Sequence, residues 1–341
     1  MPHRFLVKDI AFQAGVSTAT VDRVLNQRDG VRGPTRARIE AAIHELERQE
    51  QNIARGGKTF AIDVVMEAPD RFTLEVRLAF ESEAGTFYPN MFRMRFQSAE
   101  VLREDEFVRK LERIRSRGSD GVVVKARATG PIEAAIRTLV NAGIPVTTLV
   151  TDLPNSGRLA YAGMNNCAAG ETAAYLIAQK LGARGGRILA IMSSSRFHGE
   201  EERLAGFKDA LVRLYKNLMI TEVSEGFGRD VATGALVRDV LQHHSDICAV
   251  YSAGGGNLAI LKSFEQARRR CHVFVAHDLD AENRVLLANG QIDYVLDHNL
   301  KQDIRAIFSL LLEHHNAKSQ THNHALSEII VVTPFNMQRE A

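Results

Sequence analysis

The chain has 341 residues, of which 45% are apolar and 25% are charged, and its formal net charge is +2. This composition is typical of a globular protein and excludes a disordered or fibrous one, while the length favours more than one domain. There is no uncharged apolar run of about 18 residues and no apolar N-terminus, so we expect a cytoplasmic protein without a membrane span. The three cysteines form no CxxC pair, which favours reduced thiols.

The charge is distributed unevenly along the chain. Residues 1–38 hold seven lysines and arginines against three aspartates, so this segment carries +4 and the rest of the chain carries −2. A basic segment on a nearly neutral body favours attraction to phosphate at one end of the protein. The N-terminal segment is therefore the candidate for binding nucleic acid.

Residues 8–26 are predicted to form two short helices that are separated by a turn at Gly15. Each helix carries an apolar stripe on one face. The stripes consist of Ile10, Ala11 and Ala14 in the first helix and of Val21, Val24 and Leu25 in the second. Ser17 directly follows the turn, and its hydroxyl can accept the N–H near Thr20 as a helix cap. This layout predicts a helix-turn-helix; the alternative is a helical hairpin that only buries a small core.

A third helix is expected to open at Gly33-Pro34, where a first-turn proline loses no hydrogen bond. Its apolar residues Ile39, Ala42, Ile43 and Leu46 form a stripe that can close a small core over the first two helices. Residues 48–58 then form a connector.

The pattern KDIA..AGVS.ATV.RVLN, followed by VRGPTRARIEAAIHEL, resembles the DNA-binding head of the LacI/GalR family of bacterial repressors over roughly the first 50 residues. The resemblance implies that the second helix enters the major groove of double-stranded operator DNA. Arg23 can then pair with a guanine, and Ala19 can offer a methyl contact, while Asp22 either forms a salt bridge within the head or reads a cytosine amino group. The expected DNA-binding residues are Lys8, Ser17, Thr18, Ala19, Thr20, Arg23, Asn26, Arg32, Arg36, Asn52 and Arg55.

The connector departs from the family pattern. In the family this segment is a hinge helix that inserts a leucine into the minor groove, and Asn52 and Arg55 fit that pattern. Gly57 stands where the leucine is expected, behind Gly56. Each glycine costs a helix roughly 1 kcal/mol relative to alanine. A flexible tether is therefore the alternative to a hinge helix.

From Phe60 onward, predicted strands alternate with predicted helices. The strands are expected at 60–66, 91–97, 120–126, 144–151, 186–193, 219–226, 247–253, 272–278 and 327–333. The helices are expected at 74–86, 103–117, 131–142, 166–182, 199–215, 230–244 and 256–269. Such alternation predicts βαβ units and parallel sheets, arranged as a two-lobed α/β body.

The body resembles the type I periplasmic-binding-protein-like sensor domain of the same family, through patterns such as DGVVV (120–124), ERLAGF (202–207) and VFVAHDL (273–279). The expected organisation is a helix-turn-helix domain at 1–50, a hinge at 51–58 and a ligand-binding domain at 59–341. Lobe 1 would comprise 59–163 and 298–327, and lobe 2 would comprise 164–297 and 328–341. The chain would cross between the lobes near Gly163, Asp297 and Ser327.

Ligands of parallel sheets bind beyond the carboxyl ends of the strands. Polar and aromatic residues at these ends can hydrogen-bond and stack on a sugar or polyol, the ligand class that the resemblance implies. The family's effector-contacting arginine corresponds to Arg203. Gly255-Gly256 stands where many members carry Asn-Asp. The expected ligand-binding residues are Asp70, Arg71, Phe72, Lys125, Asp152, Arg203, Asn257, His277, Asp278 and Asp297.

The sequence has no GxSxG and no HExxH motif, so we expect no catalytic residues, no metal site and no cofactor. Residues 314–324 are rich in histidine and are expected to form a polar loop, with a weak adventitious metal site as the alternative.

The sequence thus predicts a transcriptional repressor that is controlled by a small-molecule effector. Paired recognition helices on palindromic DNA imply a homodimer or a tetramer. The alternative is a ligand sensor whose DNA binding is non-specific or lost.

Overall fold

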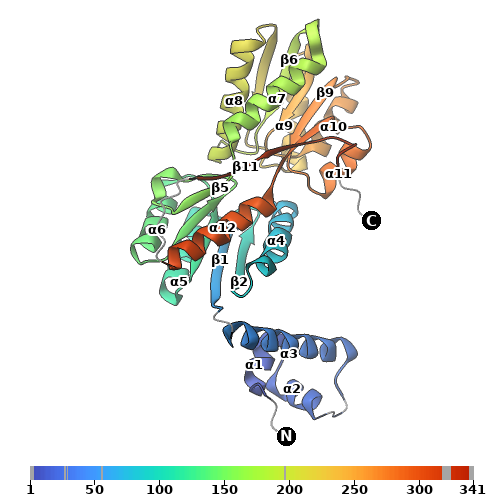
Figure 1. Cartoon of the computed structure of the whole chain (residues 1–341). Coiled ribbons are helices and arrows are strands. Elements are labelled where there is room, and N and C mark those ends of the chain that lie inside the picture. Colours follow the sequence, from blue (N-terminus) through green and yellow to red (C-terminus); the bar gives the residue numbers. More distant parts are fainter. Residues whose placement is uncertain are drawn as a thin grey trace. The chain divides into compact units, whose positions relative to one another are not determined.

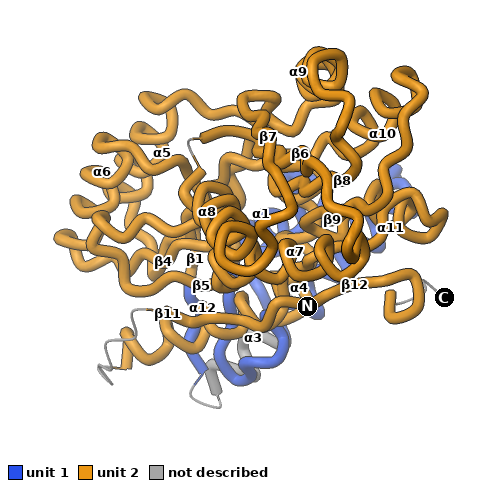
Figure 2. The backbone as a smooth tube through the Cα atoms, turned by 90° about the horizontal axis from the view of Figure 1, so that it is seen from above, with its two compact units in different colours: residues 1–60, 84–93 blue, residues 61–83, 94–341 orange. Residues whose placement is uncertain are grey.

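The computed structural model describes residues 4–26, 28, 30–54, 57–195, 197–316 and 324–337, without the side chains of residues 48–54. It divides into two compact units, residues 1–60 with 84–93 and residues 61–83 with 94–341 (Figure 2). In the described part of the chain, no helix combines the length and the apolar character needed to cross a membrane.

The head consists of α1 (Val7–Ala14), α2 (Thr18–Leu25) and α3 (Gly33–Ala54). Gly15 ends α1 at φ 62°, a left-handed conformation that glycine adopts without a Cβ penalty. The hydroxyl of Ser17 accepts from the backbone N–H of Thr20 at 3.2 Å, which confirms the predicted cap of α2. Nη2 of Arg38 donates to the carbonyl of Ala14 at 2.7 Å and ties α3 to the end of α1.

The three helices enclose a small apolar core, and its members are those that the stripes predict. Fully or nearly buried are Ile10, Ala11, Ala14, Val21, Val24, Ile39 and Ala42. The helix α3 is longer than expected, since it continues through Ala54 into the predicted connector. The sequence explains this extension, because no glycine or proline occurs between Pro34 and Gly56.

Lobe 1 is built on a six-stranded sheet in the order β11-β5-β4-β3-β1-β2 (Figure 1). The strands pair in parallel where the register is determined, with Val64 of β1 opposite Val123 of β3. The strands are β1 (Thr59–Glu67), β2 (Met91–Ala99), β3 (Gly121–Lys125), β4 (Val146–Leu149), β5 (Ala160–Met164) and β11 (His324–Ser327). The associated helices are α4 (Asp70–Ala84), α5 (Glu104–Arg117), α6 (Gly130–Asn141) and α12 (Leu300–His315), with short 3-10 turns at Gly85–Phe87 and Pro154–Ser156.

Lobe 2 is built on a second sheet in the order β12-β10-β9-β8-β6-β7, in which β12 runs antiparallel to β10 and the other neighbouring strands pair in parallel. Its strands are β6 (Gly186–Ile191), β7 (Leu218–Val223), β8 (Ile247–Ser252), β9 (Val273–His277), β10 (Tyr294–His298) and β12 (Ile329–Val332). Its helices are α7 (Asn166–Leu181), α8 (His198–Leu214), α9 (Asp230–His243), α10 (Asn257–Gln266) and α11 (Ala281–Ala288), with a 3-10 turn at Gly182–Arg184.

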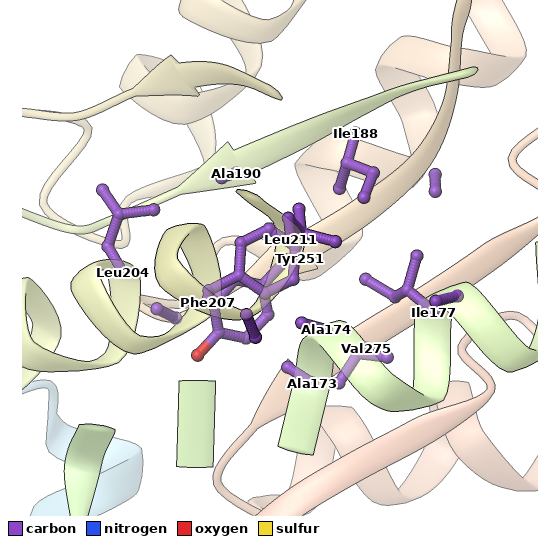
Figure 3. Close-up of a cluster of buried hydrophobic side chains, with 14 of the residues drawn as sticks. Ala173, Ala174, Ile177, Ile188, Ala190, Leu204, Phe207, Leu211, Tyr251 and Val275 are labelled. Atoms are coloured by element: carbon purple, nitrogen blue, oxygen red, sulfur yellow. The ribbon is translucent and has the colours of Figure 1, made fainter. Parts of the chain in front are cut away.

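Both faces of the second sheet are covered, as parallel sheets require. The helices α7 and α8 pack on one face, and α9, α10 and α11 pack on the other (Figure 1). On the first face, Phe207 of α8 stacks on Tyr251 of β8 with ring centroids 4.4 Å apart (Figure 3). This packing fixes α8, the helix that carries Arg203, against the sheet.

The chain passes between the two sheets three times. It leaves the first sheet after β5, returns from β10 into α12, and crosses again between β11 and β12. Most of the strand expected at 327–333 is present as β12 (Ile329–Val332), whereas Ser327 ends β11 of the first sheet and Glu328 lies between the two strands. In the histidine-rich segment, His314 and His315 end α12 and His324 begins β11, while residues 317–323 lie outside the described residues.

Candidate functional site

A cavity of about 890 Å³, its mouth included, lies between the ends of the strands of the two lobes. Lobe 1 contributes residues that follow β1, β2, β3 and β4, and lobe 2 contributes residues that follow β6, β7, β8 and β9. Among the described residues, no group of three or more His, Cys, Asp or Glu is arranged to hold a metal ion.

On the lobe 1 side, Lys125 ends β3 and extends its ammonium group into the cavity. The ammonium lies 5.7 Å from the ring centroid of Phe72 and 4.5 Å from that of Phe197. Its Nζ donates a long hydrogen bond, 3.4 Å, to the carbonyl of Glu67. Burial lowers the pKa of Lys125, and the nearby carboxylates of Glu200 and Asp278 partly oppose that shift. Lys125 therefore keeps donor capacity for a ligand.

On the lobe 2 side, Arg203 of α8 is positioned by an unusually close crossing of α7 and α8. A Cβ on Gly170 would lie 1.9 Å from the carbonyl oxygen of Arg203, and one on Gly206 would lie 2.1 Å from that of Cys167. Only glycine allows backbones to approach this closely. The crossing brings Nε of Arg203 within 2.9 Å of Oδ1 of Asn166.

Arg203 is only 3% exposed, and its guanidinium donates hydrogen bonds to three acceptors. Besides Asn166, it donates to the carbonyl of Ala253 at 3.2 Å and to Nε2 of His298 at 2.8 Å. A guanidinium has five N–H groups, so two remain for a ligand in the cavity that Arg203 lines. The arrangement suits a hydroxylated or anionic ligand group.

The end of β9 contributes His277 and Asp278. Nε2 of His277 lies 2.9 Å from the hydroxyl of Tyr251, whereas Nδ1 of His277 and Oδ1 of Asp278 have no hydrogen-bond partner among the described residues. Burial lowers the pKa of His277 well below its usual value and raises that of Asp278. Buried polar atoms without partners are rare in folded proteins and call for an explanation; a bound ligand would supply one.

Several residues with strained backbone conformations also line this cavity. Val150, Phe227 and Asp278 all line it and adopt left-handed φ angles of 66°, 53° and 64°. Each such residue costs of order 1–3 kcal/mol and persists where the surrounding structure enforces it, commonly at functional sites.

Glu200 lies one helical turn before Arg203 on α8. Its carboxylate accepts from the backbone N–H and the hydroxyl of Ser193, at 2.6 and 2.5 Å. Gly254 permits this approach, because a Cβ there would lie 2.0 Å from the nitrogen of Ser193. Burial raises the pKa of Glu200. The carboxylate faces the cavity as an acceptor for ligand hydroxyls.

The structure brings six of the ten predicted ligand residues together around the cavity. These are Arg71, Phe72, Lys125, Arg203, His277 and Asp278.

The other four predicted residues do not line this cavity. Asp70 is exposed at the start of α4, and Asp152 is buried in an ion pair with Arg158. Nδ2 of Asn257 donates to Asn283 at 2.7 Å. Asp297 accepts from the N–H of Leu279 at 2.9 Å and lines a different cavity along α4 and β12.

Sequence reasoning missed other lining residues, chiefly Glu67, Phe197, Glu200, Phe227 and Asp280. For two of these residues, the sequence contains a signal that could have identified them. Glu67 ends β1 and so belongs to the strand-end set, and Glu200 precedes Arg203 by three positions, which places both on one helix face. Phe227 sits in a loop with a left-handed backbone, which no sequence pattern indicates.

In the head, α2 presents a polar face opposite its buried Val21 and Val24. Thr18, Ala19 and Arg23 are exposed on it. Lys8, Ser17, Asn26 and Arg32 are also exposed, and Thr20 and Arg36 are partly buried. The side chain of Asn52 and the whole of Arg55 lie outside what the structure describes.

Several polar side chains of α2 are held by bonds within the head. Nδ2 of Asn26 donates to Oδ1 of Asp22 at 2.8 Å, and Nη1 of Arg28 lies 3.3 Å from Oδ2 of the same carboxylate. Of the two expectations for Asp22, the structure thus contains the salt bridge within the head. Arg23 forms no such bond within the described part of the head, and it is exposed.

Two family models match the chain. Residues 6–48 match the model of bacterial regulatory proteins of the lacI family, and residues 70–319, more than half of the chain, match that of the periplasmic binding protein domain. The chain therefore belongs to the periplasmic binding protein domain family, and it carries a helix-turn-helix head of the lacI family.

Curated relatives include the HTH-type transcriptional regulator TreR of Salmonella typhimurium, 32% identical over 36% of this chain and 39% of that protein. The sucrose operon repressor of Escherichia coli is 30% identical over 34% of this chain and 36% of that protein. The chain thus matches less than half the length of these curated relatives.

Solved structures support the fold of the body. GanP, a glucose-galactose binding protein from Geobacillus stearothermophilus, aligns with a TM-score of 0.73 at 22% identity, over 82% of this chain and 99% of that one. A solute binding protein of an ABC transporter from Burkholderia graminis, in complex with D-arabinose, aligns with a TM-score of 0.74 at 20% identity, over 82% and 97%. The body is therefore a type I periplasmic-binding-protein-like fold of two parallel-sheet lobes.

Proposed function

We propose that the protein is a transcriptional repressor whose head binds operator DNA and whose cavity binds a small polyhydroxylated effector. The observation that carries the DNA-binding half is α2, which exposes Thr18, Ala19 and Arg23 while its opposite face closes the core of the head. A helix held in this way can enter a major groove with its N-terminal residues against base edges. The names of the curated relatives, a transcriptional regulator and a sucrose operon repressor, support the same assignment.

The effector half of the proposal rests on the cavity. Lys125 and Arg203 offer donors, Glu200 and Asp278 offer acceptors, and Phe72 offers a ring face. Alternating donors and carboxylates match the hydroxyls of a sugar or polyol, since each hydroxyl both donates and accepts. The similar solved structures of a glucose-galactose binding protein and of a solute binding protein in complex with D-arabinose support this ligand class.

We further infer a cytoplasmic homodimer, because lacI-type heads read palindromic half-sites in pairs. Catalysis forms no part of this proposal, since the cavity presents binding groups and its curated relatives are named as regulators.

The proposal is tested by selecting duplex DNA from a random library with the full-length protein. Enrichment of one palindromic sequence is expected, and a library that stays random after repeated rounds would refute specific DNA binding. In parallel, thermal melting against sugars, polyols, sugar acids and purines tests the cavity. A ligand at a hundred times its Kd stabilises the folded state by roughly 2.7 kcal/mol.

The second candidate is a ligand sensor with non-specific DNA binding. It is favoured by Gly57, which stands where the family's hinge leucine is expected. A salt titration separates the two, because non-specific binding falls steeply with salt for every sequence, whereas a specific regulator keeps its preference for one site.

A further inference from the structure

An ion pair joins the two lobes across the mouth of the cavity. Arg71 begins α4 in lobe 1, and its Nε lies 2.7 Å from Oδ2 of Asp280 in lobe 2. The side chain of Asp280 is only 6% exposed and that of Arg71 is 31% exposed. Oδ1 of Asp280 is used separately, since it accepts from the N–H of Asn283 and caps α11.

Gly255 lies against the guanidinium of Arg71. A Cβ on Gly255 would lie 2.5 Å from Nη2 of Arg71, and Gly255 has φ +85°. The glycine therefore leaves room for the guanidinium in its present position.

Two further contacts join the same walls. Oγ1 of Thr151 in lobe 1 accepts from the N–H of Gly199 in lobe 2 at 3.0 Å. The ammonium of Lys125 in lobe 1 lies 4.5 Å from the ring centroid of Phe197 in lobe 2. All three contacts are made directly between protein groups of the two lobes.

We propose that the Arg71–Asp280 pair is a latch that holds the two lobes closed over the cavity. This proposal rests on the proposed function only for the identity of the ligand that enters the cavity. A ligand can reach Asp278 and Lys125 only after the pair has opened, and it is enclosed when the pair re-forms. The latch therefore sets how often the empty protein samples its open form.

The test uses the full-length protein with no effector and no DNA. The chain contains no tryptophan, so Val101→Trp introduces a single fluorophore at the cavity, where Val101 is 49% exposed. Quenching by acrylamide then reports access to the cavity. Removing a partly exposed ion pair is expected to raise the open-to-closed ratio about fivefold, so Arg71→Ala should increase the quenching constant.

Further variants test whether the increase in the quenching constant is caused by loss of the Arg71–Asp280 pair. Asp280→Asn should act like Arg71→Ala while keeping the cap of α11, because asparagine also caps helices. The double variant should have the same quenching constant as either single variant. Arg77→Ala removes the same charge from the same helix and should leave quenching unchanged.

Unchanged quenching in Arg71→Ala, or single effects that add fully in the double variant, would overturn the latch. Circular dichroism and the melting temperature verify that each variant is folded. Since neither DNA nor effector is present, failure here leaves the proposed function untouched, and failure of the DNA selection leaves the latch untouched.

Discussion

Arg203 donates a hydrogen bond to Nε2 of His298, with 2.8 Å between the two nitrogens, and both side chains are nearly fully buried. Because arginine can only donate, Nε2 must accept, and the neutral imidazole carries its proton on Nδ1. Burial and the charge of Arg203 both hold the pKa of His298 well below its usual value. His298 is thus a fixed acceptor for Arg203 behind the cavity.

Replacing His298 tests this assignment. His298→Leu should destabilise the protein by about 1–3 kcal/mol, because it leaves a buried N–H of Arg203 without a partner. His298→Gln keeps a hydrogen-bond acceptor and should lose clearly less stability than His298→Leu. Urea unfolding midpoints of the full-length variants decide between them, and equal losses in the two would contradict the role of Nε2.

Gly170→Ala should be among the most damaging small substitutions. The added methyl would lie 1.9 Å from the carbonyl oxygen of Arg203, and overpacking of this kind costs typically 1–3 kcal/mol or more. Gly130→Ala is the matched control, since no atom lies within 4 Å of a Cβ at that position. A melting temperature that falls for Gly170→Ala and stays level for Gly130→Ala is the expected result.

Asp303 makes stability depend on pH. Burial raises its pKa to about 7, and the hydroxyl of Ser327 only partly offsets this. In the unfolded chain the carboxyl ionises near its ordinary value of 3.8. Between these values the folded state binds the additional proton, so stability falls as pH rises from about 4 to 7, by up to roughly 4 kcal/mol in total.

Asp303→Asn should remove this dependence. The variant is expected to unfold at a higher urea concentration than the parent at pH 8 and at a similar one at pH 4. A parent and variant with parallel midpoints from pH 4 to pH 8 would show that Asp303 ionises normally in the folded protein.

Arg23→Ala should weaken binding to the selected operator by about 1–3 kcal/mol, which corresponds to roughly five- to 150-fold, if the guanidinium pairs with a base. Arg23 is exposed, so the melting temperature should not change. Arg238→Ala, an exposed arginine of α9, is the charge-matched control. Anisotropy titrations with operator and scrambled duplexes measure the effect, and equal weakening on both would assign Arg23 to phosphate contacts instead.

Asp278 and Asp297 allow the position of the effector site to be tested. Asp278 lines the cavity between the lobes, and Asp297 does not. Asp278→Asn should weaken binding of the most stabilising compound of the melting panel by roughly 1.5–3 kcal/mol, through loss of a charge-assisted hydrogen bond. Asp297→Asn should bind it like the parent. Calorimetric titration provides the comparison, and the reverse order would move the site to the second cavity.

The sequence predicted the head and most of the body because periodic apolar residues mark buried faces. The core of the head contains the residues of the predicted stripes, from Ile10 to Ala42. The strand β5 was missed because Ala160–Met164 is short and holds two alanines and a glycine, without the β-branched residues that mark strands. The strand β10 and the helices α11 and α12 were not assigned from the sequence.

The candidate site was predictable only in part, because strand ends indicate the region and not the direction of each side chain. Arg71 and Asp278 follow strands and line the cavity. Asp152 also follows a strand, but Arg158, Thr148 and the N–H of Leu153 occupy its carboxylate. The competing partner comes from the tertiary structure, and no local pattern shows it.

The strands β11 and β12 are separated only by Glu328, yet β11 borders the sheet of lobe 1 and β12 borders that of lobe 2. A nonsense mutation or a proteolytic cut just before His324 would therefore strip an outer strand from both lobes at once. No uninterrupted stretch of the chain contains either lobe in full. Neither lobe can be exchanged with a relative or produced as a separate fragment by a single excision from the gene.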